Sequence, residues 1–205
     1  MRIIAGTFRS RSLDAPSGLA TRPTSDRLRE TLFNVLAPRI DGARFLDLYA
    51  GSGAVALEAL SRGAAHVDLV EKAPAALKIM RANFARLGIH RGFSIHEGAV
   101  AASLRKIGQK AARQTPAPAY DLVFLDPPYD AEAEYASTLA LLGASLSALL
   151  APSALVIAEH RRKQPLDDAY AALQRTRLLE QGDAALSFYA AKPAPEPIEW
   201  ASSPR

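Results

Sequence analysis

An apolar stretch runs directly into a glycine-rich turn and then into a helix-forming segment in residues 45–54, FLDLYAGSGA. Gly51 and Gly53 let the backbone approach a ligand closely, because glycine has no Cβ and tolerates positive φ. The amides at the start of the following helix offer hydrogen bonds to anionic or carbonyl groups. The order of strand, glycine turn and helix predicts a nucleoside-binding loop at the edge of a parallel sheet.

The residues around this turn indicate which nucleoside it binds. A dinucleotide fingerprint would carry a third glycine, but Ala56 stands at that position. Asp47 places a carboxylate just before the turn, which suits a ligand with an ammonium group, such as the methionine part of S-adenosylmethionine. Glu71 follows Asp47 by 24 residues, near the spacing at which a carboxylate meets a ribose diol in such folds. The alternative is a tight turn beside an acidic surface residue.

From residue 45 onward, short apolar runs alternate with helix-like stretches, which is typical of an α/β fold with a mostly parallel sheet. We predict seven strands, at residues 44–49, 66–71, 93–96, 120–125, 154–160, 175–180 and 185–190. The last two would form an antiparallel hairpin that turns at Gly182 and Asp183. We predict helices at residues 55–62, 74–87, 100–112 and 132–150.

An N-terminal extension precedes this pattern. Thr24 or Ser25 can cap a helix whose apolar stripe would dock on the domain, with Leu28, Leu32, Val35 and Leu36. Residues 1–20 suggest a hairpin between an Ile3-Ile4 arm and Leu13. We therefore divide the chain into a basic extension and helix (1–40), a catalytic domain (41–192) and a flexible tail (193–205).

Composition excludes several classes of protein. The 205 residues contain no cysteine, so disulfides, thiolate metal sites and cysteine nucleophiles are excluded, and we expect no metal. The start of the chain lacks the continuous apolar segment of a signal peptide. Glycine, serine and proline interrupt the long uncharged stretch of residues 135–158, so we expect no membrane partner and a cytoplasmic protein.

Positive charge is concentrated in the extension. Residues 1–40 hold seven arginines against three acidic residues, and the rest of the chain is balanced, so the extension carries the formal net charge of +4. The planar guanidinium group of arginine can donate two hydrogen bonds to a phosphate, and the release of counterions favours its binding to nucleic acid. The candidates are Arg2, Arg9, Arg11, Arg22, Arg27 and Arg29. Since the predicted helix docks through its apolar face, we expect Arg22, Arg27 and Arg29 near its start to project outward. A solvated surface with salt bridges along the helix is the alternative.

A second motif ends the predicted strand 120–125: Asp126-Pro127-Pro128-Tyr129. Because open parallel sheets bind ligands at the carboxyl ends of their strands, we expect the ends of strands 44–49 and 120–125 to face one crevice. The two prolines stiffen the backbone and remove two amide donors, which leaves the Asp126 carboxylate and nearby carbonyls as acceptors. Such acceptors can bind an exocyclic base amine and help its nitrogen pyramidalise toward a methyl donor. Tyr129 supplies a ring on which an unpaired base can stack. A proline turn with a packed tyrosine is the alternative.

These residues resemble a known family. Asp126-Pro-Pro-Tyr129 is similar to the signature of amino methyltransferases. Together with Arg2-Ile-Ile-Ala-Gly6, the block from Arg22 to Asn34 and Leu46-Asp-Leu-Tyr-Ala-Gly-Ser-Gly-Ala54, it resembles the bacterial family that methylates guanine N2 in 16S ribosomal RNA. The block from Arg22 to Asn34 is the specific part, since the other motifs occur widely among methyltransferases.

The resemblance implies a Rossmann-like class I methyltransferase fold with S-adenosylmethionine as donor and S-adenosylhomocysteine as product. It implies 16S rRNA as partner, in an assembling small-subunit particle, with the family's guanine 966 as the target. Carried onto this chain, it assigns the target base to residues 126–129. The cofactor candidates are Asp47, Tyr49, Gly51, Gly53, Glu71, Glu97 and Ala99.

One departure concerns the adenine of the donor. Many relatives place Asp or Asn after the third strand, where this chain has Gly98, so either Glu97 or the amide of Ala99 would take over that contact.

Other functions remain open. A DNA adenine-N6 methyltransferase would share both motifs, although 205 residues leave little room for a DNA-recognition segment. A non-catalytic RNA-binding assembly factor could retain the fold. A nicotinamide dehydrogenase is disfavoured by the missing third glycine. We expect a monomer, and we expect structural or solvent-facing roles for the four histidines, which share no spacing: His66, His90, His96 and His160.

Overall fold

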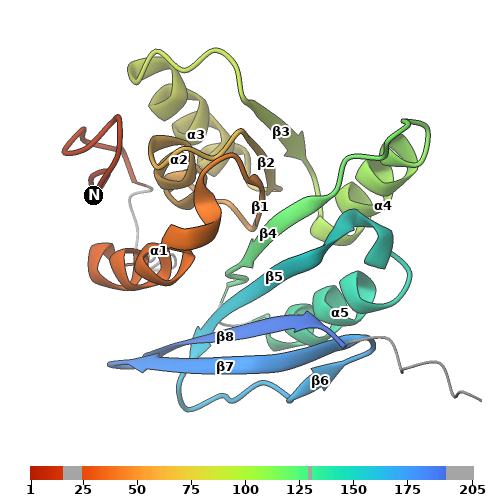
Figure 1. Cartoon of the computed structure of the whole chain (residues 1–205). Coiled ribbons are helices and arrows are strands. Elements are labelled where there is room, and N and C mark those ends of the chain that lie inside the picture. The colour runs from red at the N-terminus through yellow and green to blue at the C-terminus, as the bar shows by residue number, and fades with distance from the viewer. Residues whose placement is uncertain (16–24, 129–130, 193–205) are drawn as a thin grey trace, which may run out of the picture.

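The computed structural model describes residues 1–15, 25–128 and 131–192. In these ranges one sheet has eight strands in the order β3-β2-β1-β4-β5-β8-β7-β6 (Figure 1). The strands are β1 (Arg44–Leu48), β2 (His66–Glu71), β3 (Phe93–Glu97), β4 (Tyr120–Leu125), β5 (Leu150–Arg161), β6 (Ala169–Tyr170), β7 (Leu173–Gln181) and β8 (Ala184–Ala191). Neighbours among β1 to β5 are parallel, and β8 and β7 follow antiparallel. The predicted parallel sheet and hairpin are confirmed, and the two-residue β6 is an eighth strand that the sequence did not reveal.

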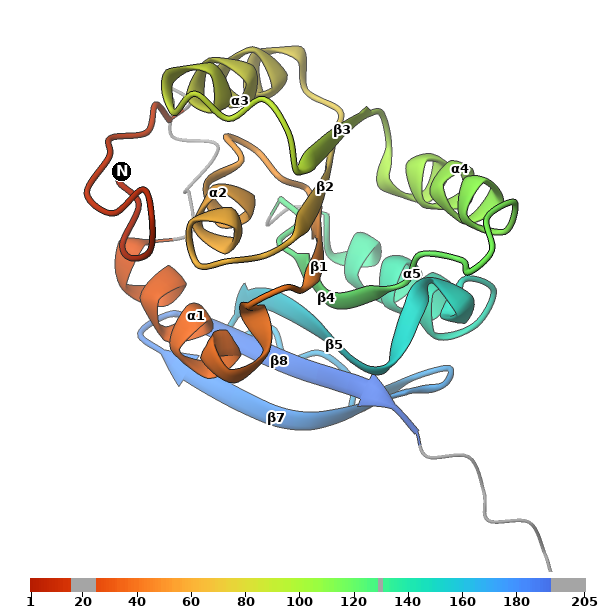
Figure 2. The same ribbon diagram turned by 45° about the horizontal axis from the view of Figure 1, so that its top comes forward.

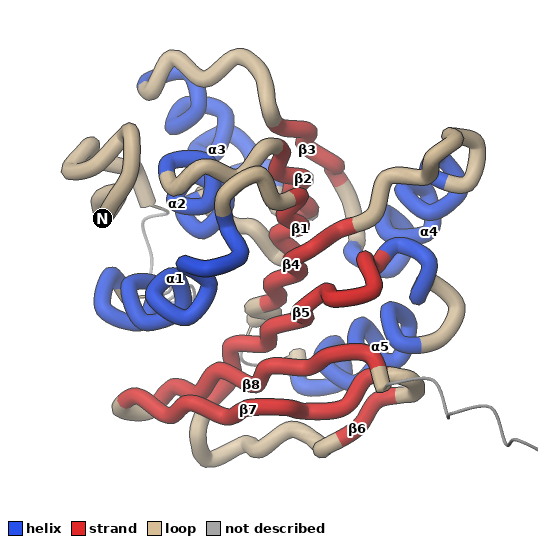
Figure 3. The backbone as a smooth tube through the Cα atoms, in the orientation of Figure 1, coloured by secondary structure: helices blue, strands red, loops and turns tan. Residues whose placement is uncertain are grey.

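Helices cover both faces of this sheet (Figure 3). They are α1 (Asp26–Ile40), α2 (Ala54–Ser61), α3 (Pro74–Arg86), α4 (Val100–Ala111), α5 (Glu132–Gly143) and the short 3-10 helix η1 (Ser147–Leu149). Helices α1, α2 and α3 pack on one face with one buried apolar cluster, and α4 and α5 pack on the other face with a second cluster. The result is the three-layer arrangement expected when both faces of a parallel sheet are apolar.

Helix α1 docks through the apolar stripe that the sequence predicts. Ser25 caps it, since its hydroxyl accepts a hydrogen bond from the Leu28 amide at 3.1 Å. Leu28, Leu32 and Leu36 are buried against the core, and Val35 packs at its margin. The helix therefore belongs to the same packed body as the sheet.

The first fifteen residues form the hairpin that the sequence suggested, here called the N-terminal hairpin (Figure 2). The Ile3 amide donates to the Arg11 carbonyl at 3.0 Å, and the Leu13 amide donates to the Met1 carbonyl at 2.9 Å. The side chains of Ile3 and Leu13 are buried in the cluster under α1 and α2. The hairpin is therefore held by apolar burial as well as by its own hydrogen bonds.

The largest difference from the predicted elements lies between α5 and β5. The predicted helix 132–150 ends at Gly143, where a Cβ would lie 2.4 Å from the Tyr170 carbonyl oxygen, so the close approach of β6 ends the helix there. Strand β5 begins at Leu150, before Pro152, instead of after it. Its register against β4 shifts between Tyr120 and Leu122, and proline is tolerated at such an irregularity because no ladder bond is lost.

No helix in the described ranges is long and apolar enough to span a bilayer.

Candidate functional site

The carboxyl ends of parallel strands bring the two sequence motifs to one edge. Leu48, the last residue of β1, is in register with Val70 of β2 and with Leu125, the last residue of β4. The glycine loop (residues 49–53) and the loop with the predicted catalytic residues therefore leave neighbouring strands at the same edge. After that prediction we call the second loop the catalytic loop (residues 126–131, described as far as Pro128 and again at Ala131). The strand order reverses here between β1 and β4, which is where open α/β sheets bind their ligands.

The two glycines of the glycine loop have different surroundings. A Cβ on Gly51 would meet nothing within 4 Å, so the loop leaves open space there for a ligand. A Cβ on Gly53 would lie 3.1 Å from Met80 Cγ and 3.4 Å from side-chain carbons of Leu69 and Phe84. Gly53 thus allows the loop to pack tightly against β2 and α3, and only Gly51 has the open surroundings predicted for both.

Glu71 fixes the shape of this loop. Its Oε2 accepts the Gly51 amide at 2.8 Å, and its Oε1 accepts the amides of Lys72 and Ala73, each at 2.8 Å. The carboxylate is half-buried and is oriented by three backbone donors. Because each carboxylate oxygen can accept more than one hydrogen bond, Oε2 keeps capacity for a hydroxyl of a bound nucleoside.

Asp47 is the buried carboxylate beneath the glycine loop. It is 2% exposed, and its Oδ2 accepts the Ala56 amide of α2 at 3.1 Å. Burial raises the pKa of Asp47 to about 8, against the opposing effect of the Ala56 amide, and the nearby charge of Glu71 raises it further. A carboxylate held in this way favours either a proton or a cationic partner.

Tyr49 links the glycine loop to the helix that follows the catalytic loop. Its hydroxyl lies 2.7 Å from Glu134 Oε2 and 2.9 Å from Thr138 Oγ1, both on α5. Burial raises the pKa of Tyr49 above its usual value, so the hydroxyl keeps its proton and donates to Glu134. The hydroxyl thus contacts α5, and its predicted contact with a cofactor stays a prediction. The sequence did not point to Glu134 or Thr138.

The catalytic loop combines a half-buried acid with two prolines. Asp126 follows β4 directly and is partly exposed, Pro127 is buried and Pro128 is exposed. The Pro128 carbonyl accepts the Ala131 amide at 2.8 Å, so one of the carbonyls expected to face a substrate amine already has a partner. Tyr129 lies outside the described residues.

The two candidates for the adenine contact lie at the end of β3. Glu97 is paired in register with Glu71, so both carboxyl groups reach the same edge. The Glu97 carboxylate forms an exposed ion pair with Arg81 of α3. Ala99 is the residue that precedes α4, and its extended backbone begins that helix. Both remain predicted cofactor contacts.

The structure divides the predicted nucleic-acid-binding arginines. Arg2, Arg9, Arg11 and Arg27 are exposed on the N-terminal hairpin and the first turn of α1. Arg22 lies outside the described residues.

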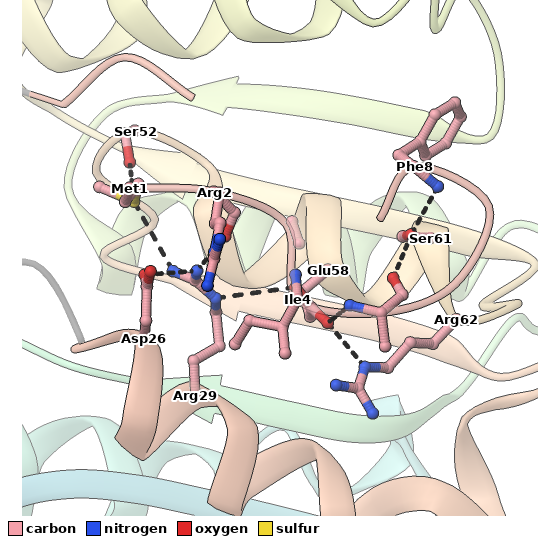
Figure 4. A network of polar contacts seen from close by, with 12 residues as sticks. Met1, Arg2, Ile4, Phe8, Asp26, Arg29, Ser52, Glu58, Ser61 and Arg62 are labelled. Carbon is pink, nitrogen blue, oxygen red and sulfur yellow. Dashed lines mark hydrogen bonds and ion pairs between the residues drawn. The ribbon is translucent and has the colours of Figure 1, made fainter. Parts of the chain in front are cut away.

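The expectation that Arg29 projects outward is wrong (Figure 4). Its side chain is 0% exposed and donates to the Arg2 carbonyl, the Asp26 carboxylate and Met1 Sδ. Arg29 Nε also lies 3.8 Å from Oε2 of Glu58, a buried carboxylate on α2. Arg29 therefore joins α1 to the N-terminal hairpin and has no surface to offer phosphate.

Glu58 is the centre of this network and was missed by sequence reasoning. It accepts the amides of Ile4 and Ala5 at 2.8 and 3.0 Å, and it pairs with Arg62 Nε at 2.7 Å. The signal for it is a lone acid in an otherwise apolar helix, since α2 reads AVALEALS. A charge in that setting needs buried partners.

Asn83 was also missed, and it connects the N-terminal hairpin to the glycine loop. Its Nδ2 donates to the carbonyls of Asp14 at 3.0 Å and Ser52 at 3.1 Å, and its Oδ1 accepts the Asp14 amide at 2.8 Å. The side chain is fully buried. The hairpin and the glycine loop therefore share one polar support. Within the described ranges no cluster of three or more His, Cys, Asp or Glu side chains could hold a metal ion.

The strand order β3-β2-β1-β4-β5, the antiparallel strands beside β5 and the glycine loop after β1 define a Rossmann-like class I methyltransferase fold. A solved structure described as the putative methyltransferase yhhF from Escherichia coli superposes with a TM-score of 0.77 at 33% identity. The match covers 94% of this chain and 98% of that one.

The sequence comparisons define the family. The model described as conserved hypothetical protein 95 matches residues 1–190. A relative named putative rRNA methyltransferase YlbH, from Bacillus subtilis, is 33% identical over 92% of this chain and 98% of its own length. Ribosomal RNA small subunit methyltransferase D of Escherichia coli is 43% identical over 63% of this chain and 60% of its own length. The chain belongs to the conserved hypothetical protein 95 family, which confirms the resemblance seen in the sequence.

Proposed function

We propose that this chain transfers a methyl group from S-adenosylmethionine to an exocyclic amino group in ribosomal RNA, and that the acceptor is N2 of a guanine in 16S rRNA. The observation that carries the proposal is the pairing of Leu48 with Leu125, which puts the glycine loop beside Asp126 and its prolines. The substrate class is suggested by the names of the two relatives above, which are named as rRNA methyltransferases.

The residues at this edge fit S-adenosylmethionine. The open space at Gly51 leaves room for the ligand, the buried Asp47 carboxylate suits its ammonium, and the oriented Glu71 carboxylate suits its ribose hydroxyls. Glu97 or the Ala99 amide, at the end of β3, would contact its adenine. When bound, the donor supplies an electrophilic methyl group on a sulfonium.

The catalytic loop supplies acceptors for the amine that is methylated. Asp126 accepts an N–H of the exocyclic amine, which draws the nitrogen lone pair out of conjugation with the ring and directs it at the methyl carbon. The nitrogen–carbon bond would form as the carbon–sulfur bond breaks, S-adenosylhomocysteine would leave with the sulfur, and the proton that the nitrogen gives up would pass to the Asp126 carboxylate or to water. Pro127 and Pro128 offer no amide that would compete for the Asp126 carboxylate. Tyr129 would stack on the base.

The exposed arginines of the N-terminal hairpin and α1 complete the proposal. Arg2, Arg9, Arg11 and Arg27 would contact RNA phosphates beside the edge, and Arg22 joins them as a sequence-based candidate. Arg29 is excluded by its burial. We place the reaction on an assembling small-subunit particle in the cytoplasm, at the family's guanine 966 site, with the protein acting as a monomer.

The test is incubation with labelled S-adenosylmethionine and, separately, ribosomal RNA, small-subunit particles and DNA, followed by nucleoside analysis. We expect N2-methylguanine in the RNA or particle samples. N6-methyladenine in DNA would refute the substrate, and transfer to none of the three would favour a non-catalytic assembly factor.

A further inference from the structure

A second group of cations lies at the same edge, outside the N-terminal extension. Strand β5 ends in Arg161, and the chain continues with Arg162, Lys163 and Gln164; we refer to residues 161–164 as the basic turn. Arg162 and Lys163 are exposed. In the described part of the chain, neither side chain has an ion-pair partner.

The basic turn lies beside the catalytic loop. Leu125 at the end of β4 is in register with Ala158 of β5, which continues three residues further to Arg161. Over the same number of residues, the chain after β4 runs from Asp126 to Pro128. Since adjacent strands lie about 4.8 Å apart, the turn borders the catalytic loop on the side away from β1 and the glycine loop.

The backbone of the turn is held in one conformation. The Gln164 amide donates to the Arg161 carbonyl at 3.0 Å, and the Arg162 amide donates to the Asp183 carbonyl at the tip of the β7–β8 hairpin at 2.8 Å. The Gln164 side chain donates to the carboxylate of Glu132, the first residue of α5. The turn is therefore attached both to the hairpin and to the helix that follows the catalytic loop.

His160 supports the turn from below. It is 2% exposed, and its Nδ1 lies 3.0 Å from the Arg161 carbonyl oxygen and 3.1 Å from that of Gln164. Its Nε2 lies 2.9 Å from Ser187 Oγ on β8. Burial lowers the pKa of His160, so the neutral ring donates from Nδ1 to the turn and accepts from Ser187 at Nε2. His160 thus supports the backbone that carries Arg162 and Lys163.

We propose that Arg162 and Lys163 bind RNA phosphates on the side of the catalytic loop opposite the glycine loop. This inference rests on the proposed function, because a nucleic-acid strand with its base in the catalytic loop extends its phosphates to both sides of that loop. The N-terminal arginines would hold one flank of the substrate and the basic turn the other. Arginine and lysine without acidic partners are the side chains that phosphate contacts require.

The experiment compares the full-length protein with Arg162→Glu/Lys163→Glu and with a matched control, Lys106→Glu/Arg113→Glu. The control also reverses two exposed positive charges, one on α4 and one just after it. The chain runs there toward the opposite edge of the sheet. For each protein we would measure the KM for small-subunit particles, the salt dependence of RNA binding and the affinity for S-adenosylmethionine.

We expect the basic-turn variant to raise the KM at least tenfold. The slope of log affinity against log salt should fall by about 1.4, at about 0.7 for each lost contact to single-stranded RNA. Its donor affinity and circular dichroism should equal those of the wild type, and the control should keep the wild-type KM.

Wild-type KM and salt slope in the basic-turn variant, or equal losses in the control, would overturn this inference while the proposed function stands. A wild-type protein that transfers no methyl group to RNA would refute the proposed function and this inference with it.

Discussion

Asp47 should make donor binding depend on pH. With a pKa of about 8 in the folded protein and 3.8 as its ordinary value, the folded state holds a proton at pH 7 that the unfolded state has lost. The contribution of Asp47 to stability is therefore fully present below about pH 4 and is lost as pH rises toward 8. An ammonium placed against the carboxylate would favour its charged form, so donor binding should release that proton.

We predict that affinity for S-adenosylmethionine rises from pH 6 to pH 7 by at most about tenfold, because the release of one proton per bound donor changes the logarithm of the affinity by at most one per pH unit. Calorimetric titrations in two buffers of different ionisation enthalpy would count the protons. Asp47→Asn should weaken binding and remove the release. Equal proton release in wild type and Asp47→Asn would show that the ammonium does not contact this carboxylate.

Tyr49 should affect turnover through its hydroxyl. Tyr49→Phe keeps the ring but removes the hydrogen bonds to Glu134 and Thr138, which connect the glycine loop to the helix after the catalytic loop. A hydrogen bond to a charged group contributes about 1.5 to 3 kcal/mol, so we expect kcat to fall about tenfold while donor affinity changes little.

Steady-state kinetics against Tyr170→Phe would check this. Tyr170→Phe also removes one hydroxyl, which accepts a hydrogen bond from the Asp167 amide at 3.0 Å in the β5–β6 connection, away from the glycine loop. If both variants reduce kcat equally, the link between the glycine loop and α5 has no special role.

A buried ion pair between Arg29 and Glu58 adds to the apolar contacts and hydrogen bonds that attach the N-terminal hairpin and α1. Removing one partner of a buried pair typically costs about 3 to 5 kcal/mol. Glu58→Leu would also remove the acceptor of the Ile4 and Ala5 amides, while Arg29 would keep its ion pair with Asp26. We predict that Glu58→Leu lowers the free energy of unfolding by that amount, and that Arg29→Met/Glu58→Leu loses much less than the two single variants together.

Urea unfolding of the wild type, Arg29→Met, Glu58→Leu and the double variant would give the coupling energy between the two side chains. Additive losses would mean that the two side chains act independently. The exposed Glu30→Leu on α1 is the control and should change stability by less than about 0.5 kcal/mol.

The bounds of elements with a clear hydrophobic pattern were predictable from sequence, and bounds that depend on tertiary contacts were not. The strands β2 and β4 begin and end where their apolar runs do, and Ser25 caps α1 as its side-chain chemistry requires. The end of α5 and the start of β5 were misplaced, because contact with β6 and a register shift decide them. Such contacts join residues far apart in the chain and leave no local pattern.

The same limit applies to the candidate site. The sequence placed the glycine loop and the catalytic loop on one edge, since both follow parallel strands. It misjudged Arg29, because helix position alone does not show that the N-terminal hairpin covers that face of α1. Formal charge predicts a basic extension, but only the structure separates its exposed arginines from the buried Arg29, which joins α1 to the N-terminal hairpin.

The proposed chemistry places Asp126 in contact with the reacting amine, so the most direct test is methyl transfer by Asp126→Ala at saturating donor and RNA. Removing one preorganised partner of a transition state typically costs about 10²- to 10³-fold in kcat. We predict a loss of that size with donor affinity unchanged, while the exposed Asp41→Asn, just after α1, keeps full activity. Transfer by Asp126→Ala at the wild-type rate would contradict the proposed chemistry.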